Sequence, residues 1–264
     1  MILTNTRDNL GDLLTCLKLI DESLDSFEED SIQVIPIAPF RENKGIVNIR
    51  IPEATEIGQY AFDNCTNLEN IYAQKVKKIN SYAFENCSKL TSANFPEVTS
   101  IDDHAFYKCS KLASANFPKI TVIDESYIFA DCTDLVSINF PALTTVIGSG
   151  NIFSSCTSLT DVDFPEVESI ETSLFTYCSS LTKVDLPKIK TLKNYVFYNV
   201  RSLEGIYLRS NSIVNLLNTN PFSNINSDKF KIYVPADLVD SYKSATNWST
   251  YADKIFAIPE EEET

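Results

Sequence analysis

The chain has 264 residues, of which 44% are hydrophobic, so it is long enough to bury a large core. Its 22 basic and 36 acidic residues give a formal net charge of −14, which opposes binding to nucleic acid or anionic lipid, since both need clustered Lys and Arg. No apolar run approaches the roughly 18–20 residues of a membrane-spanning helix, so membrane insertion is not expected. The start, Met1 to Thr6, lacks the charged and apolar regions of a signal peptide. We therefore expect that the chain is not exported as written, or that its signal has been removed.

The first predicted element is an amphipathic helix near residues 7–28. Thr6 is a favourable N-cap, and apolar residues follow it at helical spacing. These are Leu10, Leu13, Leu14, Leu17, Ile20, Leu24 and Phe27. We expect residues 1–34 to form a helical cap over the open end of a repeat array, with an oligomerisation or docking helix as the alternative.

From residue 35 the chain is organised by a repeat. Phe, Cys and Leu each recur at steps of 22, 22, 23, 24 and 22 residues. The three series begin at Phe62, Cys65 and Leu68, and residues 35–46 form an earlier coil with Asn43 in the Cys position. A unit of this length cannot bury its own apolar residues, whereas stacked units cover one another. The spacing therefore predicts a solenoid over residues 35–235.

Each coil is predicted to add one strand to a parallel sheet. A run of alternating apolar and polar residues follows the Leu of each coil and ends at Pro, as in residues 93–96. The Ala-Phe-x-x-Cys stretch opposite is predicted to be a short helical or 3₁₀ turn with Phe and Cys inward. One extra residue precedes both Phe129 and Phe153, and residues 148–151 are glycine-rich, so a local bulge is expected there.

At the C-terminal end, residues 222–235 repeat the pattern once more after a longer insertion. Residues 236–258, with Trp248, Tyr251 and Ile255, have the spacing of one or two short helices that would close this end. The acidic tail, residues 259–264, is expected to be solvated and disordered.

The repeated Ile-x-x-x-Ala-Phe-x-x-Cys-x-x-Leu-x-x-x-x-Phe-Pro of residues 57–187 resembles the BspA-like leucine-rich repeats of bacterial surface proteins. Residues 232–255 look like the usual closing segment of that family. The resemblance implies an α/β-type, right-handed leucine-rich-repeat solenoid of about 22–24-residue coils, with a parallel sheet on one face and helical caps at both ends. It also implies a cell-surface or secreted protein used for adhesion or protein-protein contact. Departures are Gln74 for Pro, Val200 for Cys and the missing signal peptide, so a cytoplasmic or phage-particle location is the alternative.

The cysteines occupy one position per coil and should form a line with neighbours about 4.8 Å apart. A line is the wrong shape for zinc, which needs four ligands around a point, and parallel stacking disfavours the torsion of a disulfide. We therefore expect reduced, buried thiols, with Cys16 outside the line.

No catalytic site is predicted. The only histidine, His104, stands where other coils have Tyr60 and Tyr82, so we expect a surface repeat residue. No Walker loop, Gly-x-Gly-x-x-Gly or His-Glu-x-x-His occurs. We expect no enzymatic activity, no cofactor and no structural metal.

The outward residues of the predicted strands form the candidate binding site, a polar face with Tyr at both ends. The candidate residues are Tyr72, Asn94, Asn116, Asn139, Asp161, Asp163, Asp185 and Tyr207. Such a face predicts binding of a protein or a glycan, with weak Ca²⁺ binding at the three aspartates and a merely solvated surface as alternatives. A second hypothesis is a structural repeat domain of a phage or cell-envelope assembly, docked through the N-terminal helix. The sequence does not indicate the oligomeric state.

Overall fold

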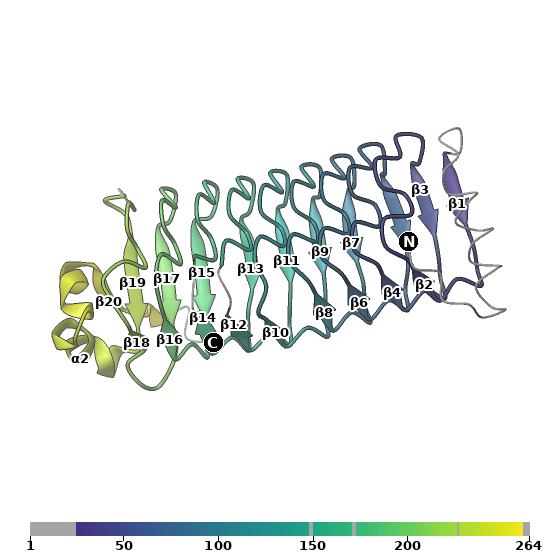
Figure 1. Cartoon of the computed structure of the whole chain (residues 1–264). Helices are drawn as coiled ribbons and strands as arrows, with labels where there is room; N and C mark the ends of the chain where they lie inside the picture. Colours follow the sequence, from purple (N-terminus) through teal and green to yellow (C-terminus); the bar gives the residue numbers. More distant parts are fainter. Residues whose placement is uncertain (1–24, 148–149, 171–172, 226, 261–264) are drawn as a thin grey trace.

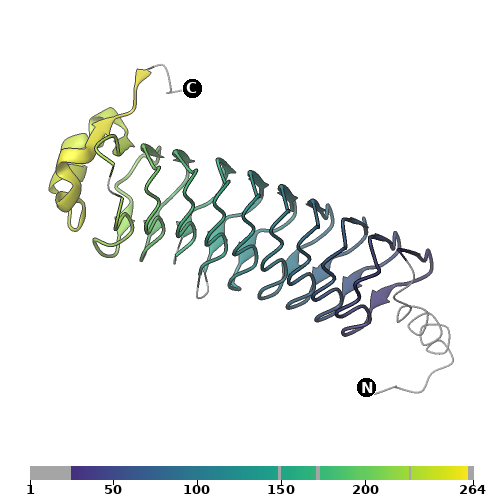
Figure 2. The ribbon, with the colours of Figure 1, turned by 90° about the horizontal axis from the view of Figure 1, so that it is seen from above.

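The computed structural model describes residues 25–147, 150–170, 173–225 and 227–260. Successive coils stack in one elongated row, with the helices of the described part gathered at the C-terminal end (Figures 1 and 2). The predicted solenoid is therefore confirmed. Its class differs from the predicted α/β type, because the coils described are built from strands and turns rather than from strands and helices.

One side of the solenoid carries strands of three or four residues, here called the long-strand sheet. All its pairings are parallel, and it falls into three hydrogen-bonded segments. The first segment is β1 (Ser26–Glu28), β3 (Asn48–Arg50) and β5 (Asn70–Tyr72). The middle segment is β7 (Ser92–Asn94), β9 (Ser114–Asn116), β11 (Ser137–Asn139) and β13 (Asp161–Asp163). The C-terminal segment is β15 (Lys183–Leu186), β17 (Gly205–Leu208), β19 (Lys231–Val234) and β20 (Ile255–Ala257).

A second side carries strands of two residues, here called the short-strand sheet, so each coil adds two strands rather than the one predicted. It has two parallel segments. The first is β2 (Val34–Ile35), β4 (Glu56–Ile57), β6 (Lys78–Ile79) and β8 (Ser100–Ile101). The second is β10 (Val122–Ile123), β12 (Thr145–Val146), β14 (Ser169–Ile170), β16 (Thr191–Leu192) and β18 (Asn215–Leu216). Two residues are too few to show a period-two pattern, which is why the sequence does not reveal this sheet.

The third side, with the Ala-Phe-x-x-Cys stretch, is a run of turns and not the predicted helical or 3₁₀ turn. Tyr60 and Asn64 have φ of 56° and 59°, and the same two positions are left-handed in most coils. A left-handed residue at every fourth position interrupts any helix. The amide of Phe62 instead donates to Ala83 of the next coil at 2.7 Å, while the amide of Cys65 closes a turn on Phe62 at 3.0 Å.

Columns of identical side chains form the core. The Phe rings of successive coils stack, with centroids 5.2 Å apart for Phe62 and Phe84 and 5.0 Å for Phe84 and Phe106. Each Phe is almost fully buried, and burial of such a side chain contributes about 1.5–3 kcal/mol to folding. The repeated residues therefore hold each coil against its neighbours.

The predicted helix near 7–28 is wrong at its C-terminal end, and the rest of it lies outside the described residues. Residues 26–28 form β1, and Phe27 pairs with Ile49 of β3. Phe27 also contacts the ring of Phe40, with centroids 5.3 Å apart. Pairing with a strand distant in sequence overrides the local helical spacing, so the repeat strands begin before the predicted boundary at residue 35.

The C-terminal segment 236–258 contains three short helices, η1 (Ala236–Leu238), α2 (Val239–Ser244) and η2 (Trp248–Lys254), where the spacing predicts one or two. Their side chains bond to the backbone of β18 and of Val214, the residue before it. Trp248 Nε1 donates to the carbonyl of Val214 at 2.7 Å, and the Val214 amide donates to the Tyr242 hydroxyl at 2.9 Å. The Trp248 and Tyr242 side chains thus bond to the backbone groups of Val214, which a further strand would otherwise pair with.

Candidate functional site

All eight predicted residues lie on the long-strand sheet with their strands in register. Parallel pairing aligns Asn94 with Asn116, then with Asn139 and Asp163. Asp185 is aligned with Tyr207 in the C-terminal segment. The four residues from Asn94 to Asp163 thus form a column rather than a ring around a point, and Asp161 lies beside it, aligned with Ser137. Such a column can contact an extended or broad surface, whereas it does not enclose a small reactive group.

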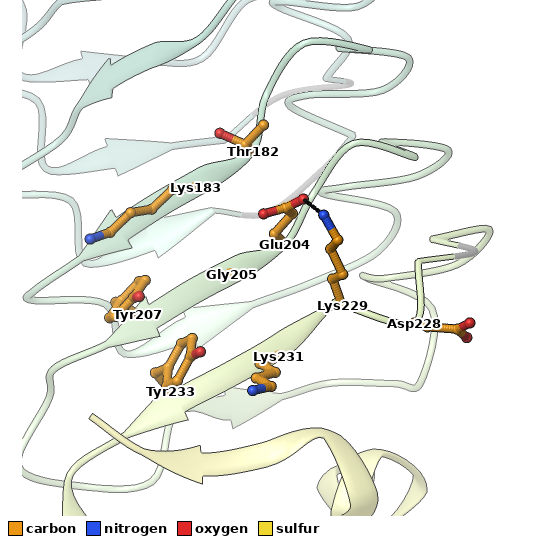
Figure 3. A pocket seen from close by; sticks show the side chains of 9 residues that line it. All are labelled: Thr182, Lys183, Glu204, Gly205, Tyr207, Asp228, Lys229, Lys231 and Tyr233. Carbon is orange, nitrogen blue, oxygen red and sulfur yellow. Dashed lines mark hydrogen bonds and ion pairs between the residues drawn. The ribbon is translucent and has the colours of Figure 1, made fainter. Parts of the chain in front are cut away.

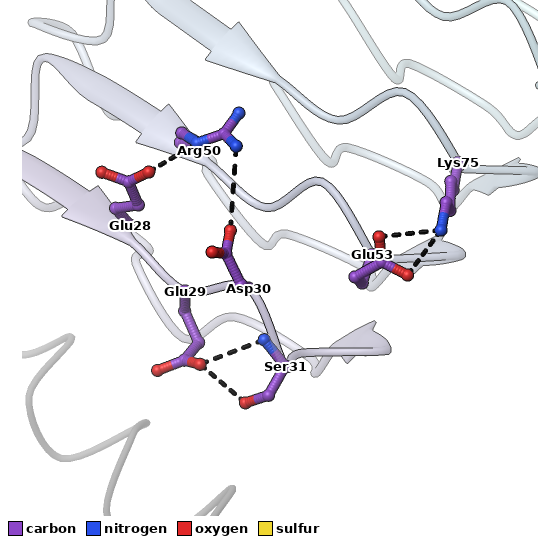
Figure 4. Close-up of polar contacts among 7 residues, drawn as sticks. All are labelled: Glu28, Glu29, Asp30, Ser31, Arg50, Glu53 and Lys75. Carbon is purple, nitrogen blue, oxygen red and sulfur yellow. Dashed lines mark hydrogen bonds and ion pairs between the residues drawn. The ribbon is translucent and has the colours of Figure 1, made fainter.

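In the first segment, the outward side chain of Arg50 forms ion pairs and lies against the candidate residue Tyr72. Arg50 Nε donates to the Glu28 carboxylate at 2.5 Å, and the guanidinium also lies 3.8 Å from Asp30 (Figure 4). The hydrogen bond to Glu28 raises the pKa of Arg50. The guanidinium lies 4.7 Å from the centroid of the Tyr72 ring, which is 46% exposed. Tyr72 is therefore available to a partner but held by the cation on one side.

The middle segment carries an amide ladder. Asn116 Nδ2 donates to Asn94 Oδ1 at 2.9 Å, and Asn139 Nδ2 donates to Asn116 Oδ1 at 2.9 Å. Each Asn amide has two N–H groups and two lone pairs, so the ladder uses only part of its bonding capacity. The ladder thus fixes the side chains and leaves donors and acceptors directed outward.

The three predicted aspartates have different surroundings. Asp161 and Asp163 are exposed on β13, whereas Asp185 on β15 is held by Arg209, whose Nε lies 2.8 Å from one carboxylate oxygen and 3.0 Å from the other. Among the residues that the structure describes, no group of three His, Cys, Asp or Glu side chains is arranged to hold a metal ion. The calcium alternative therefore gains no support.

Tyr207 differs from its prediction as an exposed residue at the end of the face. It is only 6% exposed, because its ring stacks on Tyr233 with centroids 4.6 Å apart and Lys183 Nζ lies 4.2 Å from its centroid. These contacts come from neighbouring strands, so alternation along one strand does not predict them.

Two residues outside the predicted eight also shape this end of the face. Gly205 underlies an open pocket (Figure 3). Arg209 holds Asp185 through the bonds given above. A glycine within a strand often marks a site where a ligand or another backbone approaches the strand closely. Arg209 is the next alternate position after Tyr207, so its place on the same side could have been inferred.

The six described cysteines are buried and reduced, as expected, while Cys16 lies outside the described residues. Each thiol donates to the carbonyl of a Phe in the preceding coil, as Cys65 does to Phe40 at 2.9 Å. Burial raises the pKa of the Cys65 thiol to about 12, and it also raises the pKa of Cys109 far above the ordinary range. The line of thiols is therefore core and not a reactive site.

His104 lies on the turn side, away from the candidate face. Its ring stacks between Tyr82 and Tyr127, with centroid distances of 4.8 and 5.0 Å, and its Nδ1 lies 2.6 Å from Asp103. It is the only histidine of the chain, and the described cysteines are buried in the core. Its position is that of a repeat residue in a partly buried ring column.

None of the helices in the described part of the chain is long and apolar enough to cross a membrane. The family described as BspA type leucine rich repeat region matches residues 22–132 and 123–245, in six copies. No curated protein matches the sequence.

Several solved structures are similar to the fold. A leucine rich cell surface protein from Faecalibacterium prausnitzii is 21% identical, with 77% of this chain and 82% of that chain covered and a TM-score of 0.43. A leucine rich repeat protein of T. pallidum is 22% identical, with 51% and 78% covered and a TM-score of 0.41. A leucine-rich repeat protein from Bacteroides ovatus is 20% identical, with 86% and 88% covered and a TM-score of 0.31.

Proposed function

Because the chain belongs to the BspA-type leucine-rich repeat family, we propose that it is a non-enzymatic module that binds a macromolecular partner, a protein or a glycan. The binding surface is the outer face of the long-strand sheet, centred on the middle segment. In cellular terms the proposal is an adhesion or protein-contact role at the cell surface. The docking role of the predicted 7–28 helix concerns residues that the structure mostly does not describe, and it stays a prediction.

One observation carries the proposal. The inward positions of these strands stay apolar in every coil, whereas the outward positions between them change in chemical type from one segment of the sheet to the next. The outward series runs Arg50, Tyr72, Asn94, Asn116, Asn139, Asp163, Asp185 and Tyr207. What favours binding is that a rigid face presents several different donors, acceptors and charges in fixed register, which lowers the ordering penalty on association.

The face also differs from a catalytic pocket in shape. Its polar groups stand along successive strands and not around a buried point, and the thiols and the histidine lie elsewhere. An extended polar surface with an exposed aromatic residue, here Tyr72, is suited to macromolecular contact, in which a few residues dominate affinity.

A steric block tests the proposal. The intact chain and Asn116→Arg are immobilised and exposed to envelope and extracellular extracts, and each captured macromolecule is identified and quantified. Asn116→Arg places a long cation in the middle of the amide ladder, so capture should fall by roughly tenfold or more, the loss expected of a central contact. Val122→Arg is the matched control, because Val122 is 43% exposed in the same coil but lies on β10 of the short-strand sheet. Equal capture by both variants would refute the proposed face.

A further inference from the structure

The C-terminal segment contains a gap in its outward column. Pairing places Gly205 between Lys183 and Lys231, on the two neighbouring strands. A Cβ added at Gly205 would lie 3.2 Å from a ring carbon of Tyr207 and 3.4 Å from one of Tyr233. The missing side chain leaves an open pocket of about 480 Å³, a volume within the range of small-molecule sites (Figure 3).

The aromatic wall of this pocket is fixed before any ligand arrives. Tyr207 and Tyr233 stack with an interplanar angle of 18°, and Tyr207 is 6% exposed. Lys231 Nζ lies 5.0 Å from the centroid of the Phe256 ring on β20. A preformed wall needs little ordering on binding, which favours affinity for a small group.

The lining is cationic although the whole chain carries −14. Three lysines line the pocket, Lys183, Lys229 and Lys231. Lys229 Nζ pairs with Glu204 at 3.2 Å, whereas the side chain of Asp228 points away from the lysines (Figure 3). Among the described residues no carboxylate lies within ion-pair distance of Lys231. The ammonium of Lys231 lies on the β20 side of the pocket, over the Phe256 ring, and has no ion-pair partner among these residues, so it can receive an anionic group.

We propose that this pocket binds a carboxylate-bearing sugar, such as a uronic acid or sialic-acid residue of a glycan. The inference deepens the proposed function and rests on it, because the pocket lies on the same sheet face. The sugar carboxylate pairs with Lys231, and its hydroxyls donate to the carboxylate of Glu204 and the hydroxyl of Thr182 at the rim.

An acidic peptide fits the same lining less well. Its additional carboxylates would approach Glu204, whereas sugar hydroxyls can donate to that group. A peptide also cannot add as a strand here, because β17 is already paired with β15 on one edge and β19 on the other. The mixture of cations with rim acceptors thus favours an anionic, hydroxyl-rich ligand.

The test measures sugar binding to the full chain by calorimetry and ligand-observed NMR at low salt. The probes are 3′-sialyllactose and digalacturonic acid, with lactose as the neutral comparison and a tetraglutamate peptide as the acidic one. At least one acidic sugar should bind and lactose should not. Lys231→Gln should weaken that binding roughly tenfold, as expected for loss of a charged hydrogen bond, while Lys89→Gln, an exposed lysine elsewhere, should leave it unchanged.

A second variant, Gly205→Ala, places a methyl group in the pocket and should also weaken sugar binding. If Gly205→Ala does not fold, Lys231→Gln alone tests the inference. The inference is overturned by absence of binding of both acidic sugars at millimolar concentration, by equal effects of Lys231→Gln and Lys89→Gln, or by tighter binding of tetraglutamate.

Failure of this inference can be distinguished from failure of the proposed function. No sugar binding, with capture still lost in Asn116→Arg, overturns the pocket alone. Sugar binding weakened by Lys231→Gln, with capture intact in Asn116→Arg, overturns only the site on the middle segment.

Discussion

The middle and C-terminal segments of the long-strand sheet are built on the same coil, yet their outer faces differ in chemistry. In the middle segment, the side chains of Asn94, Asn116 and Asn139 bond to one another. In the C-terminal segment, Asp185 bonds to an arginine, Tyr207 stacks on another tyrosine, and Gly205 leaves a pocket. Because inward residues fix the coil, outward residues can be exchanged without altering the stack. A repeat array can therefore carry a uniform surface and a specialised one side by side.

The interiors of the two segments differ as well. The thiol line runs from Cys65 to Cys178, and Val200 takes the Cys position in the next coil. At the C-terminal end the closing helices supply Trp248 and Tyr242 instead. The two regions should consequently respond differently to pH and to mutation.

Alkaline pH should produce the largest difference. The folded-state pKa of each thiol is raised by burial, so the fold keeps its protons while the unfolded chain loses them above about pH 8.5. The stability from neutral thiols is thus complete below that pH and is lost as pH rises toward the folded-state values. Each thiol lowers the free energy of unfolding by about 1.4 kcal/mol per pH unit in that window, and the six together by roughly 8.

Urea unfolding at pH 7.5, 9 and 10 measures this slope, and hydrogen exchange locates it in the coils with thiols. Cys109→Val is the control, because valine already occupies the same position at Val200. It should reduce the slope by about 1.4 kcal/mol per pH unit. A stability independent of pH between 8 and 10 would contradict the buried line.

Removing the closing indole should have the next largest effect and should stay local. Trp248 is 1% exposed, and Trp248→Ala should cost about 3–5 kcal/mol in the coils beside it. Since each coil contacts mainly its neighbours, hydrogen exchange should rise in β17 and β18 but not in β7 and β9. Phe256→Ala, at a 41% exposed ring of β20, should have a much smaller effect. Simultaneous loss of protection in all coils would show that the segments unfold as one unit.

Breaking the amide ladder should weaken the middle segment modestly. Asn116→Ala removes both ladder bonds of that residue, and their exposure limits the loss to about 1 kcal/mol in the free energy of unfolding. Ser114→Ala, at the neighbouring outward position of β9, serves as the comparison in the same denaturation experiment. A larger loss for Ser114→Ala would mean that the ladder contributes nothing.

Asp185→Asn should have the smallest effect. Arg209 and Asp185 are partly exposed, at 23% and 37% of their side chains, so their pair should contribute less than about 1 kcal/mol. Salt screens such a pair, and the stability difference between the native chain and Asp185→Asn should shrink as NaCl rises. Asp163→Asn, on the middle segment, should show little salt-dependent difference. A salt-independent loss at Asp185 would indicate packing against Tyr207 rather than charge.

The sequence predicted the solenoid because Phe, Cys and Leu keep one spacing, and that spacing reflects packing between coils. It could not predict the two-residue strands, such as Glu56–Ile57, because they are too short for a pattern. It misled at Phe27, where helical spacing and pairing with β3 compete and the distant strand wins. It also gave little sign of the turns, because Tyr60 is an unusual residue at positive φ.

For the candidate site, alternation along a strand correctly assigned the eight residues to one face. It did not reveal which contacts those residues make with side chains of neighbouring coils. The burial of Tyr207 depends on Tyr233, and the pairing of Asp185 depends on Arg209, each contributed by a different coil. Lateral contacts of this kind depend on rotamers and register, which a linear pattern does not contain.

The parallel stacking of short strands also has a mechanical consequence. Each coil is held to the next by strand pairs of only two to four residues, and in the described chain no disulfide crosses between coils. Tension applied to the two ends would break these strand pairs one after another. It would not have to break all the hydrogen bonds of a long strand interface at the same time. Each released coil of about 22 residues would lengthen the chain by on the order of 70 Å. The same architecture that presents a rigid face sideways can therefore extend in regular steps along its axis and absorb work as it does so.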